Sequence, residues 1–415
     1  MIQAVKGTKD ILPINVKTWQ FLEEKFRLIT HRFSYNEMRT PIFEKTEVFS
    51  RTVGDETDIV NKEMYTFIDK GGESITLRPE QTAAIARAII QNNLLQDNNL
   101  LKVWYFGSYF RYERPQKGRL REFHQFGTEC IGSNTPESDA ENIILGCELI
   151  REIGINNYSL LINSLGNEND RKNYKEKLIS YLKSNSLDLS EESIQRLEKN
   201  PLRVLDSKDP VDIELLKNAP NIIDTIEDSS LKHFQKVLDY LKNSNINYEI
   251  NHKLVRGLDY YSDTVFEFQS NELGAQNSFG GGGRYNTLFA QLGGKNIPAI
   301  GFAMGIERLI IILESLDKCK DNSNSLDFYI VVSSSEYSNY AFKIADILRK
   351  NNYSVYFDLT NKSFKSQFKD ANKLNSNYTI IIGENEVNSN SISIKNMKTS
   401  EQILIEFNKL EEFKI

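Results

Sequence analysis

The sequence predicts a mixed α/β (α+β) protein with a mainly helical insertion and a small C-terminal α/β domain. Helical and strand patterns mix over the first 130 residues and again between 254 and 315. A polar, weakly helical stretch from 166 to 250 separates these two parts. After residue 326 strands alternate with helices, which is typical of a small parallel or mixed sheet. For a chain of 415 residues these observations favour two or three domains.

Composition and residue spacing exclude several classes of protein. The chain is 40% hydrophobic and 26% charged. No apolar run approaches the roughly 18 residues that a membrane-spanning helix needs. The N-terminus lacks the apolar core of a secretory signal. Three cysteines lie far apart without a CxxC pair, and the four histidines are not spaced for a shared metal ion. We therefore expect a cytoplasmic protein, outside the membrane, without a fixed metal site.

The N-terminal part is expected to contain a helix, an extended segment, a second helix and a strand. Apolar residues recur with a mostly helical rhythm from 18 to 32. Pro41 biases its preceding residue away from helix, so the first helix must end before it. Pro79 suits the first turn of a second helix, which the alanine-rich residues after it continue. Residues 102–112 are rich in aromatic side chains and predict a strand.

A basic loop follows this strand at residues 111–121, where five arginines and lysines accompany a single acid. In an antiparallel hairpin, alternate side chains from Phe123 to Glu129 point to one face of the returning strand. Arg111 and Glu113 are expected to share a face of the outgoing strand. Arginine suits a phosphate and an aromatic ring suits a base, so this platform can hold a nucleotide. The alternative is a surface hairpin with scattered ion pairs, each worth about 0–1 kcal/mol.

A second cluster combines Arg256 with Tyr260 and Tyr261, directly before residues 265–268, whose alternation predicts a half-buried strand. The guanidinium fork suits a carboxylate or phosphate, and the tyrosine hydroxyls can donate or accept hydrogen bonds. An ordinary strand entrance is the alternative. The glycine-rich stretch 278–286 would let the backbone approach a ligand, but it matches no known phosphate-loop spacing.

Three further features have both a structural and a functional interpretation. Glu80 opens a helix, where the helix dipole stabilises a carboxylate, or it receives the ammonium group of a substrate. Glu307 and Arg308 interrupt an apolar stretch, either as a surface salt bridge or with the arginine aimed at a site. Lys362, Lys365, Lys369 and Lys373 follow helical spacing, which indicates a solvated helix face or a phosphate-binding one. Residues 317–325 form a polar linker before this last domain.

Together these segments resemble class II aminoacyl-tRNA synthetases, and most closely the histidyl-tRNA synthetase family. Residues 6–10 and 38–41 resemble the N-terminal segment and motif 1, which builds a dimer interface. Residues 110–113 with the basic loop resemble motif 2, and residues 301–308 resemble motif 3. The stretches around Arg256 and from Gly280 to Tyr285 resemble the two segments peculiar to the histidine enzymes.

The resemblance implies a class II antiparallel sheet flanked by helices and a two-step ligase that uses ATP and Mg²⁺. Expected partners are L-histidine, ATP and tRNA(His), and a homodimer is expected. The implied domains are a catalytic core at 1–165 and 251–320, a helical insertion at 166–250 and an anticodon-binding domain at 326–415. The lysine-bearing helix would contact the anticodon stem-loop.

The resemblance also implies a role for individual residues. Histidine binding falls on Glu80, Gln81, Thr82, Arg111, Gln125, Glu129, Arg256, Tyr260 and Tyr261. ATP binding falls on Arg111, Glu113, Phe123 and Arg308. The acceptor end of tRNA would meet Arg114 and Gln116. Arg256 and Arg111 would be catalytic, because they neutralise the α-phosphate that the histidine carboxylate attacks. Gln81 departs from many relatives, which have glycine there.

Two other functions fit part of this pattern. One is a synthetase-like regulatory protein that senses histidine without charging tRNA. Such proteins typically lack the anticodon domain and lose the arginines, whereas this chain has both the arginines and a C-terminal domain. The other is a class II synthetase for proline or threonine. Glu129 and Tyr261 argue against it, because a small or apolar side chain needs no such polar pair.

Overall fold

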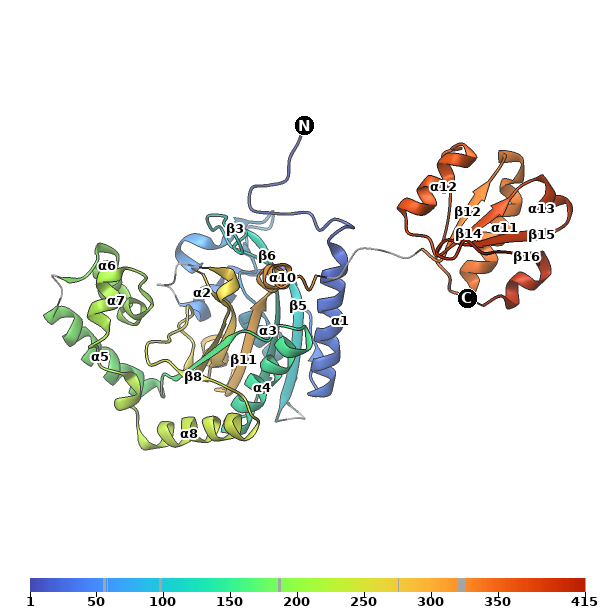
Figure 1. The fold of residues 1–415 in the computed structure, drawn as a ribbon. Coiled ribbons are helices and arrows are strands. Elements are labelled where there is room, and N and C mark those ends of the chain that lie inside the picture. Colours follow the sequence, from blue (N-terminus) through green and yellow to red (C-terminus); the bar gives the residue numbers. More distant parts are fainter. Residues whose placement is uncertain are drawn as a thin grey trace. The chain divides into compact units, whose positions relative to one another are not determined.

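The chain divides into two compact units, Met1–Lys320 and Asp321–Ile415 (Figure 1). The computed structural model describes residues 1–54, 57, 59–96, 99–185, 188–274, 276–319 and 326–414. Most of the predicted linker, residues 320–325, therefore lies outside the described residues. Each unit has its own hydrophobic core.

The first unit is built on a large, mostly antiparallel sheet (Figure 1). Within the described residues it has eight strands, in the order β1 (Asn36–Glu37), β5 (Leu101–Phe110), β6 (Glu122–Ile131), β11 (Ala299–Gly305), β10 (Ser278–Arg284), β9 (Ser262–Gln269), β7 (Ser159–Ser164) and β8 (Glu249–Ile250). The hairpin β5–β6 runs from the pair Leu101–Ile131 to the pair Phe110–Glu122. The predicted fold class, a sheet of this kind flanked by helices, is confirmed.

Helices cover both faces of this sheet. One face carries α1 (Val16–Arg32), α4 (Pro136–Glu152), α8 (Asp228–Asn243) and α10 (Ile306–Ser315). The other carries α3 (Thr82–Gln91), α5 (Glu168–Ser184) and α9 (Leu288–Gln291). Val265 and Phe266 point to opposite faces of β9, yet both side chains are fully buried. The prediction of a half-buried strand here was wrong, because helices and loops pack on both sides.

Two element ends differ from the sequence predictions. Helix α3 begins at Thr82 rather than at Pro79, because the carboxylate of Glu80 accepts the backbone N–H groups at its start. Strand β5 ends at Phe110, so Arg111 and Glu113 lie in the loop beyond the strand. Both of these side chains are therefore placed by loop contacts and not by the alternation of a strand.

The segment between β7 and β8 is helical throughout much of its length (Figure 1). It contains α5, α6 (Glu191–Lys199), η3 (Pro201–Asp206), α7 (Pro210–Leu216), η4 (Ile222–Asp224) and α8. Asn167 and Asp170 form a capping box at the start of α5. The fully buried Asp170 also accepts the N–H of Glu227 and the hydroxyl of Ser230, both at 2.8 Å. These bonds tie the first turn of α5 to the start of α8.

A small antiparallel sheet lies beside motif 1 in the sequence. Its described strands are β2 (Phe43–Lys45), β4 (Ser74–Leu77) and β3 (Tyr65–Ile68), in that order. Helix α2 (Thr46–Val53) and the short η1 (Ile59–Glu63) lie between β2 and β3 in the sequence. Elsewhere in the chain, the short η5 (Asn271–Leu273) follows β9 of the large sheet. Ile42, Phe43, Phe67 and Ile68 expose 48 to 66% of their surface, so this region presents apolar side chains to solvent.

The second unit is a mixed α/β domain, as predicted. Its described strands, in sheet order, are β13 (Val355–Phe357), β12 (Phe328–Val332), β14 (Tyr378–Ile382), β15 (Ser391–Asn396) and β16 (Gln402–Glu406). Its helices are η6 (Ser335–Tyr337), α11 (Ser338–Lys350), α12 (Phe364–Lys373), α13 (Glu384–Asn388) and η7 (Phe407–Glu412). The antiparallel pair β15–β16 was not anticipated.

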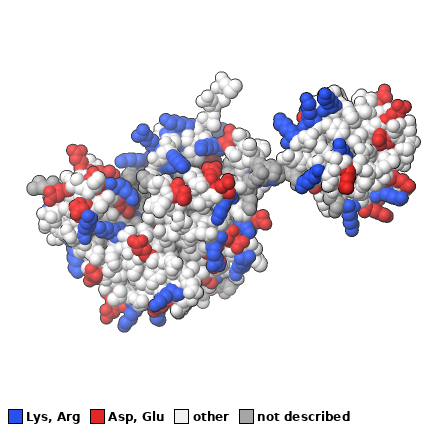
Figure 2. Space-filling model, viewed as in Figure 1, with Lys and Arg blue, Asp and Glu red and all other residues white. Residues whose placement is uncertain are grey.

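The predicted lysine stripe is only partly helical. Helix α12 carries Lys365, Lys369 and Lys373 as exposed side chains, whereas Lys362 precedes the helix and pairs with Asp370 at 2.6 Å. Asp358 also accepts the backbone N–H of Lys362 and so holds the chain before α12 in a turn. Lys and Arg side chains gather over α12 in Figure 2.

Candidate functional site

A cavity of about 1040 Å³ opens on the face of the large sheet that α3 and α5 cover. Elements far apart in the sequence form its wall: the start of α3, the β5–β6 hairpin, the loop before β9, β10 and the β11–α10 junction. All twelve residues predicted to bind histidine or ATP line it: Glu80, Gln81, Thr82, Arg111, Glu113, Phe123, Gln125, Glu129, Arg256, Tyr260, Tyr261 and Arg308.

Glu129 lies at the buried end of the cavity, where three hydroxyl groups donate to its carboxylate. Tyr285 donates to Oε2 at 2.6 Å, and Thr82 and Tyr105 donate to Oε1 at 2.8 and 3.3 Å. Burial raises the pKa of Glu129 to about 8. The carboxyl group can therefore gain or lose a proton close to neutral pH, which suits a ligand group that also exchanges protons there.

Two glycines make room for the charged side chains of the site. A Cβ atom at Gly301 would lie 1.6 Å from Glu129 Oε2, and one at Gly281 would lie 2.7 Å from Arg256 Nη1. Both glycines are on central strands of the sheet. A side chain at either position would displace the charged group, so these glycines are needed for close packing and not for a special backbone angle.

Arg256 lies in the loop before β9 and pairs with Glu267 across 2.6 Å. Its guanidinium carbon is 6.0 Å from the ring of Tyr261, which in turn packs against Tyr260 with ring centroids 4.7 Å apart. All three predicted residues of this cluster meet at the cavity together with Glu267, which the sequence analysis did not single out. An arginine paired with a carboxylate in a cavity can exchange that partner for an anionic ligand.

Glu80 and Gln81 hold the start of α3 in place. Glu80 accepts the backbone N–H groups of Thr82 and Ala83 at 2.7 and 2.8 Å, and its burial raises its pKa. The amide of Gln81 donates to Thr40 Oγ1 at 2.9 Å and accepts from Tyr109 at 3.0 Å. Gln81 therefore lines the cavity while both ends of its amide bond to the protein.

Loops with cationic side chains form another part of the cavity wall. Arg111 donates to the carbonyl of Pro79 at 3.0 Å, and its guanidinium carbon lies 5.1 Å from the ring centroid of Phe123. Glu113 pairs with Arg119 in the same loop. An arginine and an aromatic ring in this arrangement can receive a phosphate and a base, respectively.

Arg308 connects the motif 2 loop to strand β10. Its Nε donates to the carbonyl of Gly118 at 3.0 Å, its Nη1 donates to the carbonyl of Ser278, and its Nη2 donates to Gln276 at 3.3 Å. The neighbouring Glu307 turns elsewhere and accepts the N–H of His124 with both oxygens at 3.0 Å. The two residues therefore do not form a mutual surface salt bridge: both line the cavity, and the glutamate also bonds to β6.

Arg114 and Gln116 lie outside the cavity wall. Both side chains are exposed in the motif 2 loop. Gln116 and Arg119 exchange two backbone hydrogen bonds of 3.0 and 2.9 Å, which close the tip of this loop. Exposed polar side chains on a closed loop are available to a large ligand at the mouth of the cavity.

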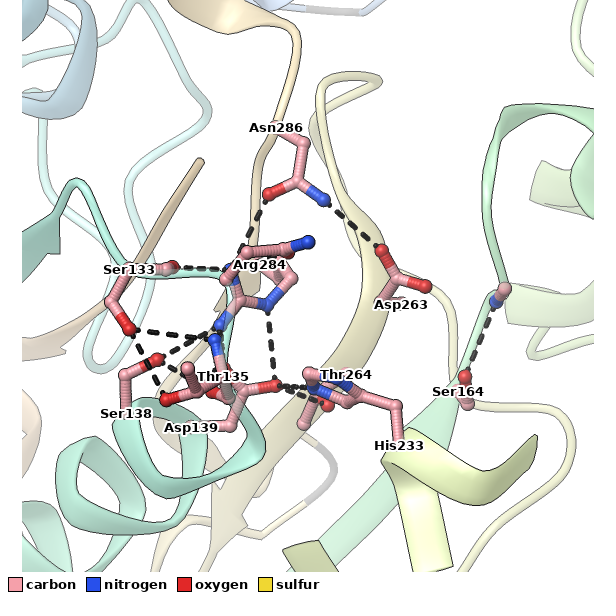
Figure 3. A network of polar contacts seen from close by, with 12 residues as sticks. Ser133, Thr135, Ser138, Asp139, Ser164, His233, Asp263, Thr264, Arg284 and Asn286 are labelled. Carbon is pink, nitrogen blue, oxygen red and sulfur yellow. Dashed lines mark hydrogen bonds and ion pairs between the residues drawn. The ribbon is translucent and has the colours of Figure 1, made fainter. Parts of the chain in front are cut away.

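Behind the cavity, the fully buried Arg284 forms a polar network (Figure 3). Its guanidinium donates to Asp139, to Ser138 Oγ and to the carbonyl of Ser133. Asp139 also accepts from Thr264 at 2.7 Å and bonds to His233 at 2.8 Å.

This network fixes strands on both sides of the tyrosines. Arg284 directly precedes Tyr285, and Thr264 follows Tyr261 by three residues. Asn286 extends the network, because its amide donates to Asp263 at 3.2 Å (Figure 3). Buried hydrogen-bonded charges of this kind specify one arrangement of the elements that carry them.

Tyr285 and Tyr105 both bond to Glu129, and the sequence analysis assigned neither of them individually. Tyr285 ends the glycine-rich stretch, so its place in that segment was the available signal. Tyr105 lies among several aromatic residues of β5, and nothing in its immediate sequence distinguishes it from its neighbours. The helical segment after β7 also lines the cavity, with Arg196, Lys199, Asn200, Arg203 and Lys208.

Comparison with known proteins decides the family. A model of the family described as histidyl-tRNA synthetase matches residues 7–309, and an anticodon binding domain matches residues 327–414. The chain belongs to the histidyl-tRNA synthetase family.

Individual relatives agree with this assignment over the full length. The chain is 47% identical over 413 residues to a histidine–tRNA ligase of Clostridioides difficile, with 99% of this chain and 98% of the relative covered. It is 46% identical over 404 residues to a histidine–tRNA ligase of Microcystis aeruginosa, covering 97 and 94%. The crystal structure of apo S. aureus histidyl-tRNA synthetase is similar with a TM-score of 0.84, 36% identity and 99% of each chain covered.

Three general features complete the description of the chain. Among the described residues, no helix is both long and apolar enough to cross a membrane. The same part of the chain contains no group of three or more His, Cys, Asp or Glu side chains that could hold a metal ion. Cys130, Cys147 and Cys319 are free cysteines.

Proposed function

We propose that the cavity carries out both steps of histidine ligation, with one end for the amino acid and one for ATP. As a member of the histidyl-tRNA synthetase family, the chain is an ATP-dependent ligase that forms histidyl-adenylate and pyrophosphate and then transfers histidine to tRNA. The observation that carries the assignment of the two ends is the buried Glu129 cluster, in which hydroxyl groups donate to the carboxylate, whereas the described loops supply cationic side chains.

The buried end binds L-histidine. Glu129 and Tyr261 hold the imidazole, with Tyr260 beside them, and the bond from Tyr285 orients the carboxylate of Glu129. Glu80 and Thr82 bind the ammonium group with Gln81 next to them, and Gln125 binds the histidine carboxylate. The raised pKa of Glu129 supports this assignment, because a group that exchanges its proton near neutral pH matches the imidazole of the substrate.

The loop end binds ATP. Arg111 and Arg308 bind the phosphates, and Phe123 stacks on the adenine. Glu113, which pairs with Arg119 in the cavity wall, would offer a carboxylate to Mg²⁺ that arrives with ATP, and the ion would neutralise phosphate charge. Mg²⁺ usually binds proteins through only one or two carboxylates plus substrate phosphates, so this donor set fits the ion.

Arg256 and Arg111 stabilise the charge that develops on the α-phosphate. The histidine carboxylate attacks this phosphorus in line, and pyrophosphate leaves with the bonding electron pair. Guanidinium groups held in a partly buried cavity stabilise such charge more strongly than they would in water. The bond from Arg256 to Glu267 supports this role, since it holds the side chain beside Tyr261 in the cavity.

The remaining parts of the chain bind tRNA(His) and a second copy of the chain. We propose a catalytic core at 1–165 and 251–320, an insertion at 166–250 and an anticodon-binding domain at 326–415. Arg114 and Gln116 meet the acceptor end, and the lysines of α12 meet the anticodon stem-loop. Dimerisation through the motif 1 region is supported by the exposed apolar residues of β2 and β3.

A cytoplasmic location is proposed on the ground of the free cysteines. The regulatory alternative is disfavoured, because Arg111, Arg256 and Arg308 are all present in the cavity wall and a C-terminal domain is present. A proline or threonine enzyme is disfavoured by the ionisable Glu129 cluster, because a small or apolar side chain needs no such polar group.

The direct test is a charging assay with purified protein, unfractionated tRNA, ATP, Mg²⁺ and radiolabelled histidine. We expect label in acid-precipitable tRNA, abolished when ATP is omitted and unaffected by an excess of unlabelled proline or threonine. Binding of histidine without any charging would instead favour the regulatory alternative.

A further inference from the structure

The loop that carries the residues peculiar to histidine enzymes has no regular secondary structure. Residues 256–261 lie between a turn and strand β9, and they belong to no helix or strand. Arg256, Tyr260 and Tyr261 all line the cavity from this loop. Because the backbone carbonyls of such a loop find no partner in a sheet or helix, other groups must satisfy them. The position of the loop therefore depends on where those groups come from.

Three of these carbonyls accept hydrogen bonds from the helical segment between β7 and β8. Arg203 donates to the carbonyl of Gly257 at 3.3 Å. Arg171 donates through Nη1 to the carbonyls of Asp259 and Tyr261, at 3.2 and 2.6 Å. The three accepting residues alternate along the chain, so the contacts span the length of the loop.

Arg171 is placed for this contact by the start of helix α5. It follows Asp170, whose buried carboxylate fixes the first turn through the capping box and through α8. The chain that follows the loop is also fixed, because Asp263 donates its N–H to the carbonyl of Gly166 at 2.8 Å. Arg171 therefore emerges from a rigid turn directly beside the loop.

The carboxylates of Glu168, Asp259 and Asp263 act on the charge of Arg171. Within the described residues it forms no ion pair, and its Nε is buried without a hydrogen-bond partner there. Burial lowers the pKa of Arg171. Burial of a cation is unfavourable for stability, and these carboxylates and the carbonyl oxygens of the loop compensate for part of that cost. A role in the site gives a reason for an arginine here, because a single guanidinium nitrogen satisfies two carbonyls of the loop.

We propose that Arg171, from the helical segment, is a positioning residue for histidine recognition. It holds the backbone at Asp259 and Tyr261 so that the tyrosine rings meet the imidazole that Glu129 binds. Glu129 itself lies on strand β6. Of the groups that recognise the imidazole, only the tyrosines of the loop therefore depend on Arg171. The inference rests on the proposed function and adds to it a residue that touches no substrate.

Loss of this contact is expected to affect one substrate more than the other. Removal of the guanidinium leaves two carbonyls without their donor, and the loop shifts relative to β6. Arg111 and Arg308 lie on other elements and have no hydrogen bond with Arg171, so the ATP end keeps its geometry. The Michaelis constant for histidine should therefore rise while that for ATP stays nearly constant.

The test compares Arg171→Ala, Arg171→Lys and Lys172→Ala in the full-length protein. Lys172 is exposed on the same turn and serves as the matched control. In ATP–pyrophosphate exchange, with histidine and ATP varied separately, Arg171→Ala should raise KM for histidine about tenfold and KM for ATP less than about twofold. Arg171→Lys should recover part of the loss, because an ammonium can donate to one carbonyl. Lys172→Ala should match the wild type.

Two outcomes would overturn the proposal while the wild type is active. One is an unchanged KM for histidine in Arg171→Ala; the other is an equal rise of both Michaelis constants together with a lower melting temperature, which would indicate a merely structural role. If Arg171→Ala does not melt cooperatively, Arg203→Gln, which removes the donor to Gly257, must show the same selective rise in KM for histidine. A wild type without histidine-dependent exchange would contradict the proposed function itself.

Discussion

The two ends of the cavity are built in different ways. At the end proposed to bind histidine, Glu129 lies on a central strand and accepts hydrogen bonds from three hydroxyl groups of other segments. At the end proposed to bind ATP, Arg111 and Arg308 donate to backbone carbonyls of loops, and part of the motif 2 loop is exposed. The first end is a buried, mutually bonded cluster, whereas the second is a set of cations on connecting segments.

This difference indicates which end provides specificity for the amino acid. A buried polar cluster that is already bonded rejects a ligand that cannot replace or complete its hydrogen bonds. Cations on loops provide charge for phosphates, and they tolerate small movements because Coulomb attraction depends weakly on geometry. We therefore expect substitutions at the two ends to affect different substrates.

The largest effect is expected for Arg256→Ala, at the junction of the two ends. The rate of adenylate formation should fall about 1000-fold, because the guanidinium stabilises charge mainly in the transition state. Histidine binding by calorimetry should change little. Loss of both binding and exchange would show that Arg256 serves the structure of the loop.

Glu129→Gln should affect the histidine end alone. The amide keeps the size of the side chain but cannot become a carboxylate, so KM for histidine should rise about 100-fold while KM for ATP is unchanged. Glu122→Gln, on the opposite face of the same strand, is the matched control. Equal increases in both Michaelis constants would contradict the separation of the ends.

Arg308→Ala should affect the ATP end alone. One charge-assisted contact to a phosphate is worth about 2 kcal/mol, so KM for ATP should rise about 30-fold. KM for histidine is the internal control and should stay within about twofold. If the histidine constant rises instead, the bonds of Arg308 to Gly118 and Ser278 organise the whole cavity.

The smallest effect concerns stability and pH. The pKa of Glu129 is raised from 4.5 to about 8, so between these values the folded state binds more protons than the unfolded state. The stability contributed by the protonated group is present below pH 4.5 and is lost as pH rises toward 8. From urea unfolding at pH 7.0 and 8.5, the wild type should lose about 1 kcal/mol relative to Glu129→Gln. A difference of the opposite sign would show that the carboxylate is favoured in the folded state.

Much of the site could be predicted from the sequence, because its residues lie in long segments with a distinct pattern. The alternation from Phe123 to Glu129 correctly placed three side chains on the cavity face, since strand geometry fixes their direction. The prediction that Arg111 and Glu113 lie on the outgoing strand was wrong, because the strand ends at Phe110, although loop contacts still place both residues in the cavity wall. Local pattern cannot specify such contacts.

Tertiary contacts account for the other differences. Nothing near Tyr285 in the sequence indicates that its hydroxyl bonds to Glu129, 156 residues away. Lys362 has the spacing of a helical residue, yet it lies before α12, where its side chain pairs with Asp370. Both outcomes depend on which groups meet after folding, and a single sequence without relatives does not contain that information.

The most direct measurement is ATP–pyrophosphate exchange by the wild-type protein with each of the twenty amino acids in turn. Recognition by the buried cluster around Glu129 predicts strong exchange with histidine and only background exchange with every other amino acid. No exchange with histidine, or comparable exchange with proline, threonine or any other amino acid, would contradict it.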